Sequence, residues 1–189
     1  MGSERVVLWR SLVDGSLDRC ALTMAPDGPQ LRGEVVTLVD GNPVRITYLV
    51  ACDSAWETQH VEVTWREGTA VRELRLDVDN EKRWWQHERE IESVRGCVDV
   101  DLGITPATNT LPIRRLTLRE GEAGKVTAAW VLFPELTVEP LPQTYTRLGE
   151  DTYRYESNLR SFTAQIQVDD FGLVTWYEGG WERVTVVDS

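Results

Sequence analysis

Apolar and polar residues alternate with a period of two along much of the chain. Val61, Val63 and Trp65 fall on one side of such a segment, and their polar neighbours fall on the other. Because successive side chains of a β-strand point to opposite faces, this pattern is typical of a half-buried strand in an antiparallel sheet. The same alternation recurs in the segments 72–78, 152–156 and 163–169.

Clusters of turn-forming residues separate these segments. Glycine, proline, aspartate and asparagine gather in APDGPQ (25–30), VDGNPV (39–44), REGTA (66–70), LGEDT (148–152), DDFG (169–172) and EGG (178–180). Short strands separated by such turns predict a mainly β protein with a many-stranded antiparallel sheet. No internal repeat or linker interrupts the pattern, so we predict one domain over residues 1–189.

One strand candidate is apolar on both faces. Ile46, Tyr48 and Val50 fall on one side, whereas Leu49 and Ala51 make the other side partly apolar. Apolar character on both faces is typical of strands that are covered on both sides. The segment therefore predicts a sheet that rolls over on itself.

A short segment breaks the alternation and predicts the single helix. Residues 108–110 (TNT) are favoured N-cap residues, and Pro112 is tolerated in a first helical turn. The apolar residues of 111–116 do not alternate but share one side of a helix. We therefore predict a strand at 97–102, a loop, and a short α-helix that begins near residue 110.

Four charged residues lie in this region, and their role has several interpretations. Asp99 and Asp101 share one face of the predicted strand, about 7 Å apart, which is also a separation at which paired carboxylates act in glycosidases. Arg114 and Arg115 lie on a helix that the rolled sheet would enclose. A buried guanidinium needs a carboxylate, so a structural ion pair between these aspartates and arginines is one prediction. A solvated outer face, a hydrolase-type enzyme using the aspartates, and an arginine that holds an anionic head group are alternatives.

Charge and composition exclude several classes of partner. The chain is 41% hydrophobic and 27% charged, with a formal net charge of -11. An excess of carboxylates disfavours binding to the phosphate backbone, so no nucleic acid partner is expected. No apolar run is long enough to span a membrane, and the N-terminus has no secretory signal pattern, which predicts a cytoplasmic protein. Three cysteines without CxxC spacing are expected to be buried and reduced.

Motifs for metal, cofactor or nucleophile chemistry are missing from the sequence. His60 and His87 have no HxH, HExxH or Cys/His partners, so no metal site is expected. Neither a GxSxG elbow nor a glycine-rich phosphate loop occurs, and no cofactor is predicted. We expect a protein that is not an enzyme and assign no catalytic residues.

Eight tryptophans are many for a chain of 189 residues. Most of them are expected to fill the core of a large sheet, although flat rings that carry one donor also line sugar and acyl-chain sites. Together with Arg114 and Arg115, the candidate ligand-binding residues are Trp84, Trp85, Trp130, Trp176 and Tyr177.

Five segments, spread over nearly the whole chain, resemble a bacterial family of glycolipid-binding proteins. They are CDSAWETQHVEV (52–63), GCVDVDLGITPATNTLPIRRL (96–116), AAWVLFPELTV (128–138), QTYTRL (143–148) and VDDFGLVTWYEGGWERV (168–184). The resemblance implies a spiral β-roll, in which a long antiparallel sheet wraps around a single helix, and it implies a homodimer. It also implies that the helix near residue 110 is the enclosed one.

These observations together predict a soluble, non-enzymatic protein that binds an amphiphile such as a glycolipid. The ligand would lie in an apolar cavity between the rolled sheet and the helix, beside an aspartate of the strand at 97–102 that holds a helix arginine. The alternatives are a hydrolase that uses Asp99 and Asp101, and a purely structural dimeric interaction protein.

Overall fold

The structure, a computed structural model, describes residues 4–157 and 161–188 and is mainly β. The first arm of strands consists of β1 (Glu4–Ser11), β2 (Leu17–Ala25), β3 (Gly28–Val39), β4 (Asn42–Cys52), β5 (Thr58–Glu67), β6 (Ala70–Val78), β7 (Trp84–Gln86) and β8 (Arg89–Glu90). The second arm consists of β9 (Asp99–Leu102), β10 (Ala123–Leu132), β11 (Thr137–Arg147), β12 (Thr152–Ser157), β13 (Phe162–Val168), β14 (Val174–Tyr177) and β15 (Trp181–Asp188). A 3-10 turn, η1 (Glu92–Val94), lies between the arms in sequence, whereas a second 3-10 turn, η2 (Ala107–Asn109), and the α-helix α1 (Thr110–Leu116) lie between β9 and β10.

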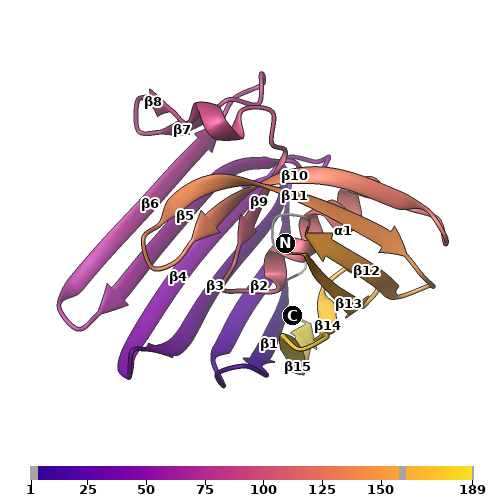
Figure 1. The fold of residues 1–189 in the computed structure, drawn as a ribbon, viewed down its shortest axis with the longest axis horizontal. Helices are drawn as coiled ribbons and strands as arrows, with labels where there is room; N and C mark the ends of the chain where they lie inside the picture. Colours follow the sequence, from indigo (N-terminus) through magenta and orange to yellow (C-terminus); the bar gives the residue numbers. More distant parts are fainter. Residues whose placement is uncertain (1–3, 158–160, 189) are drawn as a thin grey trace.

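All fifteen of these strands belong to one open sheet. Its order runs from β8 back through β1, then from β15 back through β9, so each arm is a meander of strands that are neighbours in sequence. The antiparallel pair β1–β15 joins the two arms. Figure 1 shows the two arms curving around α1, which lies between the indigo-to-magenta arm and the orange-to-yellow arm. The predicted rolled sheet around a single short helix is confirmed.

One strand pair differs from the antiparallel pattern that the sequence predicts. β9 pairs with β10 in parallel, with Asp99 opposite Ala128 and Asp101 opposite Trp130. The connection between these strands runs through η2 and α1, and such a crossover returns the chain in the same direction. The sheet is therefore mixed at this edge, and the helix is the crossover that makes it so.

Local sequence accounts for the bounds of α1. The helix begins at Thr110, as predicted, and Pro112 occupies its first turn, where its missing N–H breaks no helical hydrogen bond. The expected side-chain N-cap does not form, because η2 already continues the backbone into the helix at Asn109. Thr117 ends the helix in the left-handed region at φ 46°.

The inner faces of both arms and the buried side of α1 form one core. Trp9 and Trp84 are fully buried, and Leu111 of α1 has no exposed surface. Alternate residues of β5, β6, β12 and β13 face this core, as the apolar–polar alternation predicts. The outer face of β4 differs from the expectation: Leu49 and Ala51 are only half-buried there.

Gly33 of β3 leaves space for the ring of Tyr48 on β4. A Cβ atom at position 33 would overlap the Cζ and Oη atoms of that ring. Hydrogen bonds from its hydroxyl to Asp18 and Thr105 in the core hold the ring in this position.

Gly33→Ala is therefore expected to lower the free energy of unfolding by about 1–3 kcal/mol, the usual cost of overpacking a core. Gly149→Ala is the matched control, because a Cβ atom there would meet no atom within 4 Å. Urea unfolding of the two variants measures the difference. Equal stabilities would contradict a rigidly held Tyr48.

Candidate functional site

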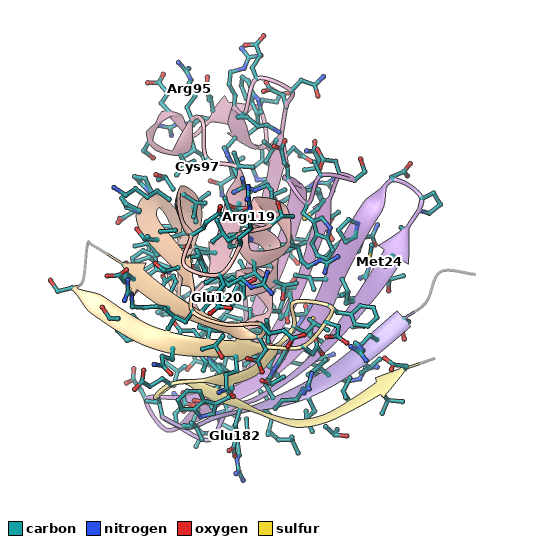
Figure 2. All side chains as sticks on the ribbon, turned by 90° about the vertical axis from the view of Figure 1, so that its right-hand side faces the viewer. Met24, Arg95, Cys97, Arg119, Glu120 and Glu182 are labelled. Carbon is teal, nitrogen blue, oxygen red and sulfur yellow. The ribbon has the colours of Figure 1, made fainter. Side chains whose placement is uncertain are left out.

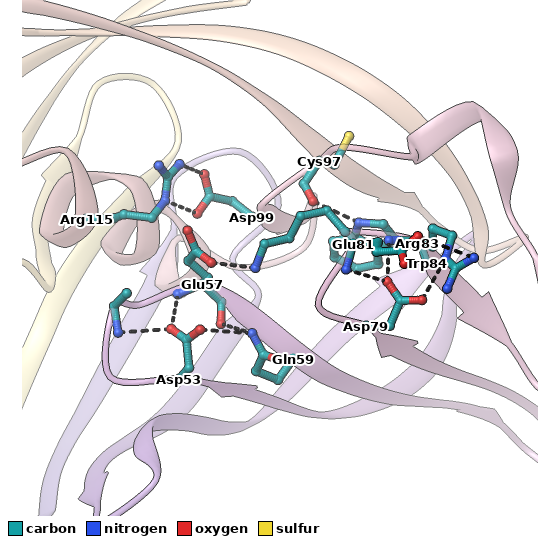
Figure 3. A network of polar contacts seen from close by, with 12 residues as sticks. Asp53, Glu57, Gln59, Asp79, Glu81, Arg83, Trp84, Cys97, Asp99 and Arg115 are labelled. Atoms are coloured by element: carbon teal, nitrogen blue, oxygen red, sulfur yellow. Dashed lines mark hydrogen bonds and ion pairs between the residues drawn. The ribbon is translucent and has the colours of Figure 1, made fainter.

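The helix and the strand β9 are joined by a buried ion pair. Arg115 donates from Nε to Asp99 Oδ1 at 3.1 Å and from Nη2 to Asp99 Oδ2 at 2.5 Å, which is a bidentate arrangement (Figure 3). Asp99 is 1% exposed. Burial raises the pKa of Asp99, and the hydrogen bonds and charge of Arg115 oppose that rise. Of the four charged residues that the sequence singles out, the structure brings these two together.

Asp101 has a different partner. Gln143 of β11 donates from Nε2 to Asp101 Oδ2 at 2.6 Å. Burial, the largest cause, raises the pKa of Asp101 to about 6, although the hydrogen bond from Gln143 lowers it. Tyr145 extends the network, since its hydroxyl donates to Asn109 Oδ1 at the start of α1. The two aspartates are thus held by separate partners.

A third buried carboxylate, Asp18 of β2, is a site that the sequence analysis missed. The side chain is fully buried and accepts hydrogen bonds from the hydroxyls of Tyr48 (3.1 Å) and Thr105 (2.5 Å). Burial raises the pKa of Asp18 to about 7. The sequence contains a signal for this site, because Asp18, Cys20 and Leu22 are alternate residues of β2 and therefore point to the same, inner face. A polar residue at an inward position is the informative kind of exception to the period-two pattern.

The side chain of Arg114 points away from α1 in a different direction from that of Arg115. It is exposed, and its Nη1 donates to the backbone carbonyl of Asp170 at 3.1 Å. Its guanidinium carbon lies 5.3 Å from the ring centroid of Trp56, on the loop between β4 and β5. Gly172, at φ 79°, leaves room for the aliphatic part of the side chain, since a Cβ there would lie 2.9 Å from Arg114 Cδ. The turn 169–172 is thus fitted around Arg114.

A cavity of about 680 Å³ opens beside Arg114, at the C-terminal end of α1. Its floor is apolar and buried, formed by Ile113, Tyr153 and Val168. Its rim is polar and exposed, and includes Arg114, Glu150, Asp151 and Asp170. The volume lies in the range of small-molecule sites, and the lining is more polar than is usual for them, since seven of its eleven residues are polar or charged.

The other predicted ligand-binding residues lie elsewhere. Trp84 is fully buried, and its indole N–H donates to the carbonyl of Cys97, so it is a core residue. Trp85 donates to Asp79 Oδ2 at the far end of the first arm. Trp130 and Trp176 are half-buried on β10 and β14, and Tyr177 packs its ring 6.2 Å from that of Tyr155. Of the seven predicted residues, Arg114 borders the cavity described above.

Three further features of the described residues bear on what the protein can bind. Within residues 4–157 and 161–188, no three His, Cys, Asp or Glu side chains converge as metal ligands. No helix in these ranges has the length and apolar character that crossing a bilayer requires. Cys20, Cys52 and Cys97 are free and buried, as expected.

Together, the rolled sheet and the short helix that it curves around define a mainly β fold, with a cavity at the end of the helix. The chain belongs to the family described as "Putative glycolipid-binding", which matches residues 6–183. The resemblance seen in the sequence is confirmed by this match.

A solved structure is similar along nearly its whole length. It is the crystal structure of a DUF1089 family protein from Pseudomonas aeruginosa, at 31% sequence identity and a TM-score of 0.82. The similarity covers 93% of this chain and 95% of that one. A comparison with curated protein sequences gives no match.

Proposed function

We propose that the protein binds an amphiphile such as a glycolipid, with the sugar head group in the cavity beside Arg114. The observation that carries this proposal is the combination of a buried apolar floor and an exposed polar rim in one cavity of about 680 Å³. The family description supports it. A sugar presents both apolar C–H faces and hydroxyl groups, so it suits such a lining.

A place for the start of an acyl chain adjoins the cavity. Asp170 and Gly172 line the cavity, whereas Phe171 between them lines a separate depression of about 170 Å³ with Leu22 and Met24. Phe171 and Met24 are each 39% exposed. Figure 2 labels Met24 on the violet strands of the first arm. An amphiphile that crosses the turn 169–172 would place its head on the polar side and its tail on the apolar side.

Binding without catalysis is part of this proposal, as is the homodimer that the family resemblance implies. The bidentate hold of Arg115 on Asp99 supports the first part, because a carboxylate held in this way is poorly suited to proton transfer. Light scattering on the purified protein tests the second.

Arg114→Gln is expected to weaken binding of a glycosyl amphiphile by at least about tenfold, because a hydrogen bond from a charged donor contributes about 1.5–3 kcal/mol. Arg119→Gln is the matched control: Arg119 is an exposed arginine just beyond α1 that does not line the cavity. Both variants are expected to fold, since both side chains are exposed.

Tryptophan fluorescence measures this binding, because Trp56 lies beside Arg114 and reports on its surroundings. Native mass spectrometry of protein purified from its own host provides a second readout. The absence of any bound amphiphile, together with unchanged fluorescence across a panel of glycolipids, would refute the proposal. Equal weakening by Arg119→Gln would refute the assigned site.

A further inference from the structure

Charges of both signs surround the cavity, but they are not equally engaged. The two arginines on its lining are Arg114 and Arg147. Arg147 uses its guanidinium on backbone carbonyls, donating to Gly149 at 2.9 Å, Leu118 at 2.9 Å and Glu150 at 2.6 Å. It therefore holds the loop after β11 in place. Arg114 makes one such bond, to the carbonyl of Asp170, and its side chain is exposed on the lining of the cavity.

The carboxylates that line the cavity also differ in whether they have a charged partner. Asp169 accepts hydrogen bonds from Arg5 and Arg183, so its charge is neutralised within the fold. Glu150, Asp151 and Asp170 are exposed, and no ion pair within the described ranges engages them. Three unpaired carboxylates thus stand on the rim beside the guanidinium of Arg114.

The three carboxylates outnumber the guanidinium groups of Arg114 and Arg147 by one, which leaves a small excess of negative charge on the lining of a chain whose net charge is -11. A phosphate or sulfate placed there would gain contacts with Arg114 but would be repelled by three carboxylates on the same lining. A neutral sugar has no such repulsion. Its hydroxyls donate to carboxylate oxygens, and its oxygens accept from Arg114, which satisfies both kinds of group on the rim.

We propose, resting on the proposed function, that the cavity is selective for an uncharged glycosyl head group and rejects phosphorylated or sulfated ones. Glu150, Asp151 and Asp170 are the residues that determine this selectivity. Arg114 orients the sugar, and the floor of Ile113, Tyr153 and Val168 contacts its apolar face.

The test compares three probes that share one sugar and one alkyl chain: a decyl hexoside, its 6-sulfate and its 6-phosphate. Fluorescence titration of the full chain is expected to show the neutral probe binding about tenfold more tightly than either anionic probe at an ionic strength of about 0.01 M. At about 1 M the difference is expected to shrink, since salt screens exposed charges.

A charge-neutralised variant assigns the effect to the rim. In Glu150→Gln/Asp151→Asn/Asp170→Asn, the 6-sulfate is expected to bind about tenfold more tightly than in the unmodified protein. The neutral probe is expected to change little. The matched control, Glu88→Gln/Glu92→Gln/Glu135→Gln, removes the same charge from exposed residues that border a different cavity. Circular dichroism checks that both variants fold.

The outcomes separate this inference from the proposed function. Equal or tighter binding of an anionic probe, or an equal gain in the control variant, overturns the selectivity but leaves amphiphile binding in place. Failure of every decyl probe to bind overturns both.

Discussion

Replacing Arg115 with methionine is expected to lower the free energy of unfolding by about 3–5 kcal/mol at neutral pH. The substitution leaves Asp99 at 1% exposure without the guanidinium that binds both of its carboxylate oxygens. A buried charge without a partner must either remain ionised in a medium of low polarity or take up a proton. Both routes cost free energy, and both loosen α1 from β9.

Urea unfolding at neutral pH measures this loss. Arg119→Met is the control, because the side chain of Arg119 is 88% exposed and its surface ion pair with Glu122 is worth less than about 1 kcal/mol. The double variant Asp99→Asn/Arg115→Met removes both charges and is expected to recover at least about 2 kcal/mol of the loss. A double variant as unstable as Arg115→Met alone would show that the ion pair is not the source of the effect.

The second large effect is a dependence of stability on pH that comes from Asp18. Its pKa is raised from 3.8 to about 7 in the folded protein, because its burial disfavours the charge. Between these two values the folded state holds a proton that the unfolded state has lost. The contribution of Asp18 to stability is therefore complete below about pH 4 and declines as the pH rises through about 7, by about 4 kcal/mol in all.

Asp18→Asn is expected to abolish this decline, because asparagine stays neutral and keeps an oxygen that accepts from Tyr48 and Thr105. Unfolding free energies of the unmodified protein and the variant at about pH 4.5 and about pH 7.5 give the comparison. As the pH rises, the unfolding free energy of Asp18→Asn should increase relative to that of the unmodified protein. Asp27→Asn, at an exposed turn, is the control and should follow the unmodified protein. Parallel curves for Asp18→Asn would contradict a neutral buried Asp18.

Much of the fold could be predicted because the alternation of period two is a direct consequence of strand geometry. Every second residue of β5 faces the core, and Val61, Val63 and Trp65 are the apolar residues at those positions. The parallel pairing of β9 with β10 could not be predicted in the same way, because it depends on where the chain returns after α1. Leu49 shows a second limit: its apolar character does not reveal whether another element covers it.

The candidate site was predictable only in part, because its members are neighbours in space and not in sequence. Residue type and spacing suggested an aspartate–arginine pair, but they did not separate Arg114 from Arg115. That choice depends on which side of a seven-residue helix faces β9. For the tryptophans, residue type did not predict location, because an indole is equally suited to a core and to a binding surface. Trp84 donates to a carbonyl within the core, a contact that no sequence pattern encodes.

The antiparallel pair β1–β15, the seam at which the two arms join, has a consequence for the folding kinetics of the chain. Apart from this seam and the β9–β10 crossover, every strand pair is a hairpin or another short connection. Loop closure costs only about 0.6 kcal/mol more for each doubling of length, yet the seam brings together residues as far apart as Arg5 and Asp188. Within each arm most paired strands are consecutive in sequence, so nucleation can begin in either one. The ion pairs from Arg5 to Asp169 and Asp188 then stabilise this long-range strand pair, at which the two arms join.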